Sequence, residues 1–315
     1  MIAIYFLVPP EVQLLDLTGP AHVFYEAREY GANLDTLFVS LEANKEALSS
    51  AGLTLGNLKP FYNYELTEKD FLFIPGLESH LFFGDDFVDN HKTFFEWLTR
   101  QYQNNAKICS VCTGAYVLGF SGLLGDRNCT THWKYINDFT SRFPKVKLLS
   151  DRLIVKDGNL YSSAGVSSGI DLSLYILEEL YGTLFATKIA KEVVLYFRRT
   201  ANDPQLSVFL QYRNHIETKV HKVQDRLSQN LSERTTIEEL AELVYMSPRN
   251  LTRLFKKTTG ITIGNYLERL RAEKALQLQS KGEKIGAIAL AVGLKSENRT
   301  RGLLKKYAPA ERRRS

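Results

Sequence analysis

The sequence has few cysteines and lacks the common cofactor motifs. Only three cysteines occur among 315 residues, and an odd number in a long chain argues against a disulfide framework. No Cys/His set has the spacing of a zinc site, and neither common type of Gly-rich phosphate loop is present. We therefore expect no metal and no cofactor, and a reducing, cytoplasmic environment.

Long apolar runs are also missing. The run Met1 to Val8 has no basic leader and is too short for a membrane span or a signal peptide. With 44% hydrophobic and 24% charged residues, the chain is expected to be soluble and globular, without a membrane partner.

The net charge of +5 hides an asymmetry between the two ends of the chain. Residues 1–204 contain 18 Lys and Arg against 24 Asp and Glu, a net charge of −6. Residues 205–315 contain 22 against 11, a net charge of +11. A basic folded region is typical of binding to a phosphate backbone, although charge alone favours a solvated helical surface.

Strands and helices alternate through the first two-thirds of the chain, which predicts a doubly wound, flavodoxin-like α/β sandwich. Apolar runs predict strands at 2–8, 34–41, 70–76 and 106–111, and alternation around Asp157-Gly158 predicts a hairpin over 152–161. Ligands bind such sheets at the carboxyl ends of the strands. Asp16, Leu77 and Cys112 each follow a predicted strand, so we expect them to meet there.

Cys112 lies where the strand 106–111 passes into a predicted helix from Thr113. This is the pattern of a nucleophile elbow, in which the junction side chain stands beside the first N–H groups of the helix. Those N–H groups favour a thiolate. Cys112 is therefore either a nucleophile or part of a ligand pocket.

Several motifs in this region resemble the class I glutamine amidotransferase-like superfamily, which includes intracellular proteases and isonitrile hydratases. They are Cys-Thr-Gly-Ala-x-x-Leu-Gly from Cys112, Gly122-Leu123-Leu124, Thr130-Thr131-His132-Trp133 and Ser163-Ala164-Gly165. The resemblance spans roughly residues 1–195. It implies that the elbow cysteine is reactive and that Asp16 is its acidic neighbour, although Asp16 could instead cap the helix after the first strand.

The residues favour a sensing pocket over catalysis. The amidotransferase triad uses a late His-x-Glu pair, and none occurs near Gly165 to Asp171. We expect a small-molecule effector, nitrogen-containing by the resemblance, to contact Asp16, Leu77, Cys112, Thr113 and His132. The alternative is a cysteine-dependent hydrolase or hydratase, like isonitrile hydratase, that uses Cys112 and Asp16.

The basic region contains two copies of a helix-turn-helix pattern. Ile237-x-x-Leu240-Ala241-x-x-Val244-x-Met246 recurs 48 residues later as Ile285-x-x-Ile288-Ala289-x-x-Val292-x-Leu294. The apolar spacing packs one helix on the next, and the alanine allows a close crossing. In the first copy Ser247-Pro248 supplies an N-cap followed by a first-position proline.

Polar side chains on the second helix of each copy are candidates for DNA contacts. Arg and Asn near the start of such a helix can reach base edges, whereas later lysines suit phosphates. The candidates are Arg249, Asn250, Arg253, Lys256 and Lys257 in the first copy, and Arg299, Arg301, Lys305 and Lys306 in the second. With one inserted residue, Thr300 replaces Leu251 and Gly302 replaces Arg253, so we expect base reading mainly from the first copy.

The first copy, with Arg269-Leu270-Arg271-Ala272, resembles the AraC/XylS family of transcription regulators. The resemblance implies promoter DNA as partner, with the two units in successive major grooves about 34 Å apart. It also implies a homodimer and contact with RNA polymerase. We predict a sensing domain at 1–200, a linker at 201–214 that contains the turn Asn202-Asp203-Pro204, and an all-α DNA-binding domain at 215–315.

Overall fold

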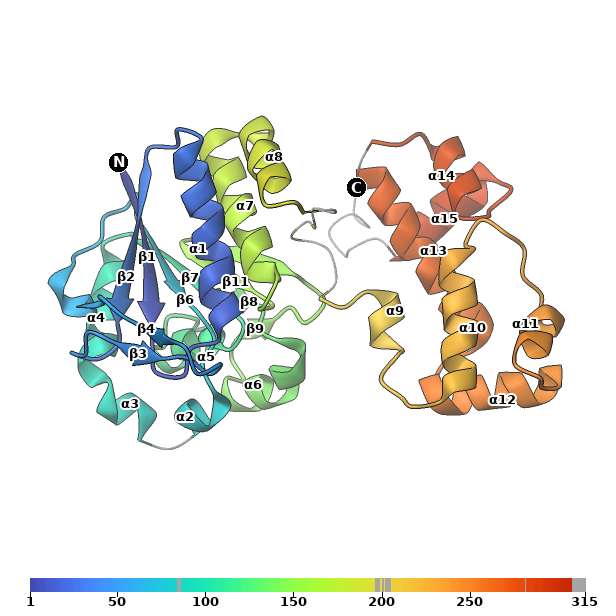
Figure 1. Ribbon diagram of the computed structural model, residues 1–315, viewed down its shortest axis with the longest axis horizontal. Helices are drawn as coiled ribbons and strands as arrows, with labels where there is room; N and C mark the ends of the chain where they lie inside the picture. The colour runs from blue at the N-terminus through green and yellow to red at the C-terminus, as the bar shows by residue number, and fades with distance from the viewer. Residues whose placement is uncertain (84–85, 196–198, 200, 202–204, 281, 308–315) are drawn as a thin grey trace. The chain divides into compact units, whose positions relative to one another are not determined.

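The computed structural model describes the whole chain except residues 84–85, 196–198, 200, 202–204, 281 and 308–315 (Figure 1). Contacts between Cα atoms divide it into two compact units, Met1–Gln205 and Leu206–Ser315. No helix in the described part is both long and apolar enough to cross a lipid bilayer.

Unit 1 is built on a seven-stranded sheet with the order β10-β11-β7-β6-β1-β2-β5. The strands are β1 (Ile2–Val8), β2 (Leu34–Ser40), β5 (Lys59–Pro60), β6 (Phe71–Ile74), β7 (Lys107–Val111), β10 (Ile154–Asp157) and β11 (Leu160–Ser163). All neighbouring pairs are parallel except β10 and β11, which form the predicted antiparallel hairpin. The order reverses at β1, because β2 lies on one side of it and β6 on the other. Two short strand pairs lie outside this sheet. One is antiparallel, β3 (Ala47–Leu48) with β4 (Thr54–Leu55), and the other is parallel, β8 (Asn128–Cys129) with β9 (Lys147–Leu148).

Helices cover both faces of the sheet, as the doubly wound prediction requires. Alternate residues of β1 enter different cores: Phe6 joins the cluster that includes Phe24 of α1, whereas Leu7 joins the cluster that includes Leu98 of α4. The helices α1 (Leu14–Glu29), α7 (Ser168–Tyr181) and α8 (Thr183–Glu192) lie together on one side (Figure 1). The other core is covered by α4 (Lys92–Gln103), α5 (Gly114–Phe120) and α6 (Ile136–Arg142).

The remaining elements of unit 1 are short. They are the helices α2 (Ser79–Phe83) and α3 (Phe87–Asn90) and the 3₁₀ turns η1 (Phe61–Asn63) and η2 (Trp133–Tyr135). The α/β prediction for this part of the chain is confirmed.

The described part of unit 2 is entirely helical. Its helices are α9 (Val208–Gln211), α10 (Thr218–Gln229), α11 (Ile237–Leu243), α12 (Pro248–Thr259), α13 (Ile263–Ser280), α14 (Ile285–Ala291) and α15 (Glu297–Tyr307). The long helix α13 serves two cores, because Tyr266 packs with α10–α12 and Ala275 packs with α14 and α15.

Two expected boundaries differ from the observed ones. Within the all-α domain expected from residue 215, the first helix, α10, begins at Thr218, and Ile216 is 97% exposed. Helix α9 lies inside the stretch expected to be a linker, and the predicted turn at Asn202-Asp203-Pro204 lies outside the described residues.

Candidate functional site

Cys112 occupies a strained turn between β7 and α5, as the elbow pattern predicts. Its φ is 58°, a left-handed value that side-chain-bearing residues rarely adopt. The amide of Cys112 donates to the carbonyl of Ser163 at 3.1 Å, which ties the turn to the end of β11. The side chain is 7% exposed.

Asp16 lies beside Cys112 and does not cap α1. The N-cap of that helix is Gln13, and Asp16 belongs to its first turn. The Asp16 carboxylate instead accepts hydrogen bonds from the amide of Gly76 at 3.1 Å and from the amide of Val166 at 2.6 Å. The capping alternative is therefore wrong, because both carboxylate oxygens are engaged by loops that follow β6 and β11.

Burial controls the protonation of this pair. It raises the pKa of the Asp16 carboxyl, against hydrogen bonds from Val166, the Cys112 thiol and Gly76 that lower it. Burial, and then the charge of Asp16, raise the pKa of the Cys112 thiol well above its ordinary value. Cys112 is thus held as a protonated thiol at neutral pH.

A pocket of about 210 Å³ opens at this edge of the sheet. Its lining includes all five residues predicted to bind a ligand: Asp16, Leu77, Cys112, Thr113 and His132. Thr113 joins two of the loops, because its hydroxyl accepts from the amide of Leu77 and donates to the Leu77 carbonyl, each at 3.2 Å. The loops after β1, β6 and β7 therefore meet as expected.

Seven further residues line the pocket and were missed from the sequence. They are Gln13, Leu15, Glu78, Ser79, Lys134, Tyr135 and Val166. Most are sequence neighbours of the predicted residues. Val166 directly follows the motif Ser163-Ala164-Gly165 after β11, and that motif was the available signal.

His132 contributes a neutral imidazole to the lining. Burial, and then the charge of Lys134, lower the pKa of its ring. The ring nitrogen Nδ1 is buried and has no hydrogen-bond partner among the described residues.

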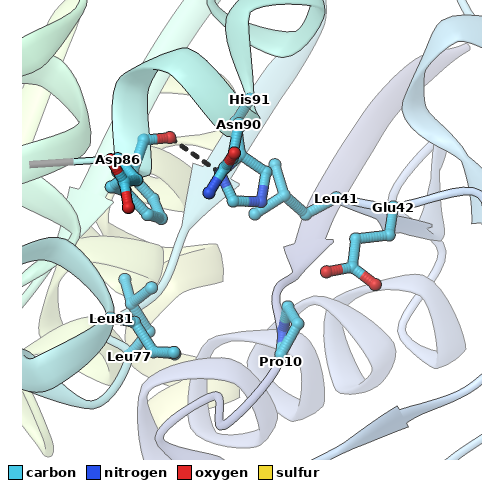
Figure 2. A pocket seen from close by; sticks show the side chains of 9 residues that line it. Pro10, Leu41, Glu42, Leu77, Leu81, Asp86, Asn90 and His91 are labelled. Carbon is cyan, nitrogen blue, oxygen red and sulfur yellow. Dashed lines mark hydrogen bonds between the residues drawn. The ribbon is translucent and has the colours of Figure 1, made fainter. Parts of the chain in front are cut away.

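A second pocket, of about 250 Å³, adjoins the first through Leu77. Figure 2 shows Asp86 and Glu42 on different sides of it, with Leu81 and Leu77 below Asp86. His91 is oriented there by a 2.8 Å hydrogen bond between its Nδ1 and the carbonyl of Phe87 (Figure 2). No sequence pattern indicated this cavity.

The first helix-turn-helix consists of α11 and α12. The hydroxyl oxygen of Ser247 accepts from the amide of Asn250 at 3.3 Å, and Pro248 is the first helical residue, so the predicted cap is confirmed. Leu251 and Phe255 are fully buried. All five candidate DNA-contacting residues of α12, Arg249, Asn250, Arg253, Lys256 and Lys257, are exposed.

The second helix-turn-helix, α14 and α15, contains the expected insertion. The helices α11 and α14 begin 48 residues apart, whereas α12 and α15 begin 49 apart. Ser296 thereby takes the capping position of Ser247, and its hydroxyl oxygen accepts a hydrogen bond from the amide of Arg299 at 3.5 Å. The sequence comparison had missed Ser296. Thr300 is buried in the place of Leu251, and Gly302 is exposed in the place of Arg253.

The candidate cations of α15 are all exposed but differ in their partners. Arg301 pairs with Glu297 at 2.8 Å and also donates to Asn298. Lys306 pairs with Glu268 of α13 at 2.7 Å. Arg299 and Lys305 have no side-chain partner of this kind among the described residues.

Comparison with known proteins agrees with both halves of the structure. The model of the DJ-1/PfpI family matches residues 3–179, and a helix-turn-helix domain model matches residues 240–308. The chain is 27% identical to the HTH-type transcriptional regulator CdhR of Pseudomonas aeruginosa, over 93% of this chain and 84% of that protein. It is 33% identical to the isonitrile hydratase of Pseudomonas putida, over 56% of this chain and 71% of that protein.

The matches to the HTH-type transcriptional regulators GbdR and ArgR of Pseudomonas aeruginosa, at 30% and 29% identity, cover 60% and 62% of this chain but only 50% and 59% of those proteins. Among solved structures, a putative transcriptional regulator protein from Vibrio parahaemolyticus superposes with a TM-score of 0.54 at 20% identity, over 61% of this chain and 98% of that one. That likeness shows the fold of unit 1.

These features define a class of proteins in which a DJ-1-type α/β domain precedes a helix-turn-helix domain. The chain belongs to the DJ-1/PfpI family, and with its AraC-type second unit it is a DNA-binding transcription regulator.

Proposed function

We propose that unit 1 senses a small-molecule effector in the 210 Å³ pocket and that occupancy changes how unit 2 binds promoter DNA. The observation that carries this proposal is the convergence of Asp16, Cys112 and His132 on one pocket in a chain that also has a DNA-binding unit. A ligand regulates only if its affinity differs between two states of the protein.

The lining suits a small polar metabolite. It combines the acidic residue Glu78, the basic residue Lys134 and the neutral ring of His132. A nitrogen-containing effector could hydrogen-bond to these groups, and the unpartnered Nδ1 of His132 is one position for such a bond. The protonated thiol of Cys112 supports binding in preference to nucleophilic attack, since the thiolate is the nucleophile.

The DNA-contacting residues and the assembly are parts of the same proposal. Arg249, Asn250 and Arg253 would contact bases, and the lysines of α12, with Arg299, Arg301 and Lys305 of α15, would contact phosphates. A homodimer and contact with RNA polymerase follow from the AraC resemblance.

A thermal-shift screen of the full chain with nitrogen-containing metabolites tests the sensing role. A ligand at 100 times its Kd stabilises its domain by about 2.7 kcal/mol. A genuine effector should lose its shift with His132→Ala and keep it with His22→Ala, whose side chain is exposed on α1. An effector that raises the unfolding temperature of both variants equally would bind outside this pocket.

A mobility shift on the DNA that flanks the chain's own gene tests the DNA-binding residues. Arg253→Ala should weaken binding, whereas Arg100→Ala, an exposed arginine of unit 1, should not. Binding should fall steeply with salt, because each neutralised phosphate releases counterions. Absence of any salt-sensitive binding would count against the whole proposal.

Hydratase chemistry is the second candidate, favoured by the contact between the Cys112 thiol and Asp16 and by the isonitrile hydratase relative. The purified chain would then convert an isonitrile to a formamide, and Cys112→Ala would abolish the conversion. No turnover by the wild-type chain would remove this candidate.

A further inference from the structure

Two histidines of unit 2 pack against each other at the start of α10. His215 lies just before the helix and His221 lies near its start, with ring centroids 4.4 Å apart and ring planes inclined by 35°. The Nε2 atoms of both rings are buried and have no hydrogen-bond partner among the described residues. Most buried polar atoms are hydrogen-bonded, so this pair calls for an explanation beyond packing.

The neutral form of His215 is bonded to the residue that begins α10. Its Nδ1 accepts a hydrogen bond from the amide of Glu217 at 3.3 Å, and Glu217 is the N-cap of the helix. A neutral imidazole that accepts at Nδ1 carries its one proton on Nε2. A second proton must therefore enter at Nδ1, where it would face the N–H of Glu217, donor against donor. Protonation of His215 breaks this hydrogen bond.

The surroundings of the pair also disfavour two cations. Burial, and then His221, lower the pKa of His215, and Arg213 acts in the same direction. Gln224 and the carbonyl of Tyr212 favour the cation, but Oε1 of Gln224 makes no hydrogen bond of good geometry. Both rings lie at the N-terminal end of a helix, where the backbone dipole repels positive charge. The stability that neutral His215 contributes is therefore complete above the ordinary histidine pKa and is lost as the pH falls through the lowered one.

The other charged groups at this site have partners of their own. Both carboxylate oxygens of Asp225 accept from the guanidinium of Arg213, and the carboxylate of Glu217 accepts from an amide in the first turn of α10 at 3.3 Å. The helices α11 and α12 contribute apolar side chains to the adjoining core. None of these bonds gives the histidines a carboxylate partner. The titratable side chains of α13 that contact the segment before α10 are Tyr266, Arg269 and Glu273.

The segment before α10 also contacts the core that positions α12. The carbonyl of Tyr212 accepts from Nε2 of Gln224 at 2.7 Å, and the ring of Tyr212 meets Tyr266 edge-on, with centroids 5.9 Å apart. Tyr266 in turn contacts Phe255 of α12, with centroids 5.5 Å apart. Phe255 is fully buried, whereas the candidate DNA contacts of α12 are exposed. Separation of the segment from this core therefore loosens the packing of α12.

We propose that His215 and His221 form a pH-sensitive switch in unit 2. At neutral pH the pair closes the start of α10, and when both rings are protonated the segment 212–217 separates from the helix and DNA binding weakens. Histidine suits this role because its charge changes between about pH 5 and pH 8. The switch responds to protons and needs no effector, so it goes beyond the proposed sensing function and does not depend on it.

Hydrogen exchange of the full chain tests the switch without DNA. The amides to follow are those of Glu217 and of His221, which donates to the carbonyl of Glu217 at 3.1 Å. Exchange is measured from about pH 7.5 to about pH 5.5 and expressed as a protection factor, so that the intrinsic effect of pH cancels. We expect both protection factors to fall about tenfold, as the loss of one hydrogen bond implies. The amide of Phe6, in β1 of unit 1, should keep its protection.

Two variants test the histidines themselves. His215→Asn keeps an acceptor at the place of Nδ1 and cannot be protonated, so its protection factors should not depend on pH. His221→Gln leaves only one ring to be protonated, so the fall should be smaller than in the wild type. His22→Asn, at an exposed position on α1, is the matched control and should behave as the wild type. Far-UV circular dichroism confirms that each variant is folded.

The affinity of the same chains for the DNA that flanks the chain's own gene, at one ionic strength, measures the output. Acid adds positive charge to exposed histidines, which by itself strengthens binding to phosphates, so a loss of affinity points to the switch. We expect the wild type to lose affinity several-fold at the acidic end and His215→Asn to lose little.

Unchanged protection at both amides of the wild type, or a full response in either variant, would overturn the switch. Loss of protection without loss of DNA affinity would also overturn it, because the pair is assigned a role in DNA binding.

Discussion

Gly165 lies directly against Cys112: a Cβ atom built on Gly165 would stand 2.4 Å from the Cβ of Cys112. Carbon atoms attract best at about 3.5–4.0 Å, so no larger residue fits at this position without moving the elbow. The φ of Gly165 is 101°, which side-chain-bearing residues rarely adopt. The turn after β11 and the elbow after β7 therefore pack directly against each other.

We expect Gly165→Ala to lower the free energy of unfolding by about 2–4 kcal/mol, because it adds overpacking to a backbone penalty. Urea unfolding followed by far-UV circular dichroism measures the change. Gly122→Ala is the control, since Gly122 also has a positive φ, 75°, but nothing lies within 4 Å of its added Cβ. It should cost only about 1 kcal/mol. Equal losses in the two variants would show that the contact with Cys112 carries no energy.

The reactivity of Cys112 should follow its raised pKa. A raised thiol pKa leaves little thiolate at neutral pH, so alkylation of Cys112 should be slower there than that of an ordinary cysteine and should climb steadily as the pH rises past the ordinary thiol value. Asp16→Asn removes the negative charge that helps to raise this pKa, so it should quicken alkylation at a given pH. Mass spectrometry of the Cys112 peptide measures both rates.

A rate at Cys112 that levels off near neutral pH would contradict the assignment of a protonated thiol. As an internal comparison, Cys129 is also buried, and burial raises its pKa to about 12. It lies outside the lining of the pocket and should not respond to Asp16→Asn.

The elements and the place of the pocket could be predicted because they depend on local pattern and on one rule of topology. Apolar runs gave the strands, and the carboxyl ends of parallel strands brought Asp16, Leu77 and Cys112 together. The partners of Asp16 could not be found this way. The amides of Gly76 and Val166 are 60 and 150 residues distant in sequence, and an amide has no sequence signature.

Other features escaped although the register was known. The expected insertion before α15 aligns Ser296 with Ser247, but the sequence comparison did not extend to this cap. The hydrogen bond from Gln205 to the carbonyl of Thr131 was missed for a different reason, since a glutamine next to a predicted turn is read as part of a linker. Only the packed fold shows that its side chain is directed back to Thr131.

The turns of the two helix-turn-helix units use the same backbone conformation with different residues. Tyr245 and Gly293 occupy equivalent positions with φ values of 53° and 68°. Tyr245 is 92% exposed, so Tyr245→Gly loses little packing and relieves a penalty of about 1 kcal/mol. We expect this variant to be as stable as the wild type or slightly more stable in thermal unfolding.

Gly293→Ala should have the opposite effect. Its Cβ would stand 2.5 Å from the carbonyl oxygen of Leu231, so we expect a loss of about 2–4 kcal/mol in urea unfolding. If both substitutions had similar small effects on stability, the difference in space around the two turns would not matter.

The loop before the first helix-turn-helix is held by a half-buried arginine. Arg271 of α13 donates to the carbonyl of Leu231 through Nε at 3.2 Å and through Nη2 at 3.1 Å, and to the carbonyl of Glu233 at 3.2 Å. Burial lowers its pKa, so the cation depends on these carbonyls in place of water.

Arg271→Met should therefore cost about 2–3 kcal/mol of unfolding free energy. Arg271→Lys should recover only part of it, since one ammonium cannot span both carbonyls. Arg234→Met, at an exposed position in the same loop, should leave urea unfolding unchanged. Full recovery by lysine would show that the charge at Arg271 matters and its planar fork of donors does not.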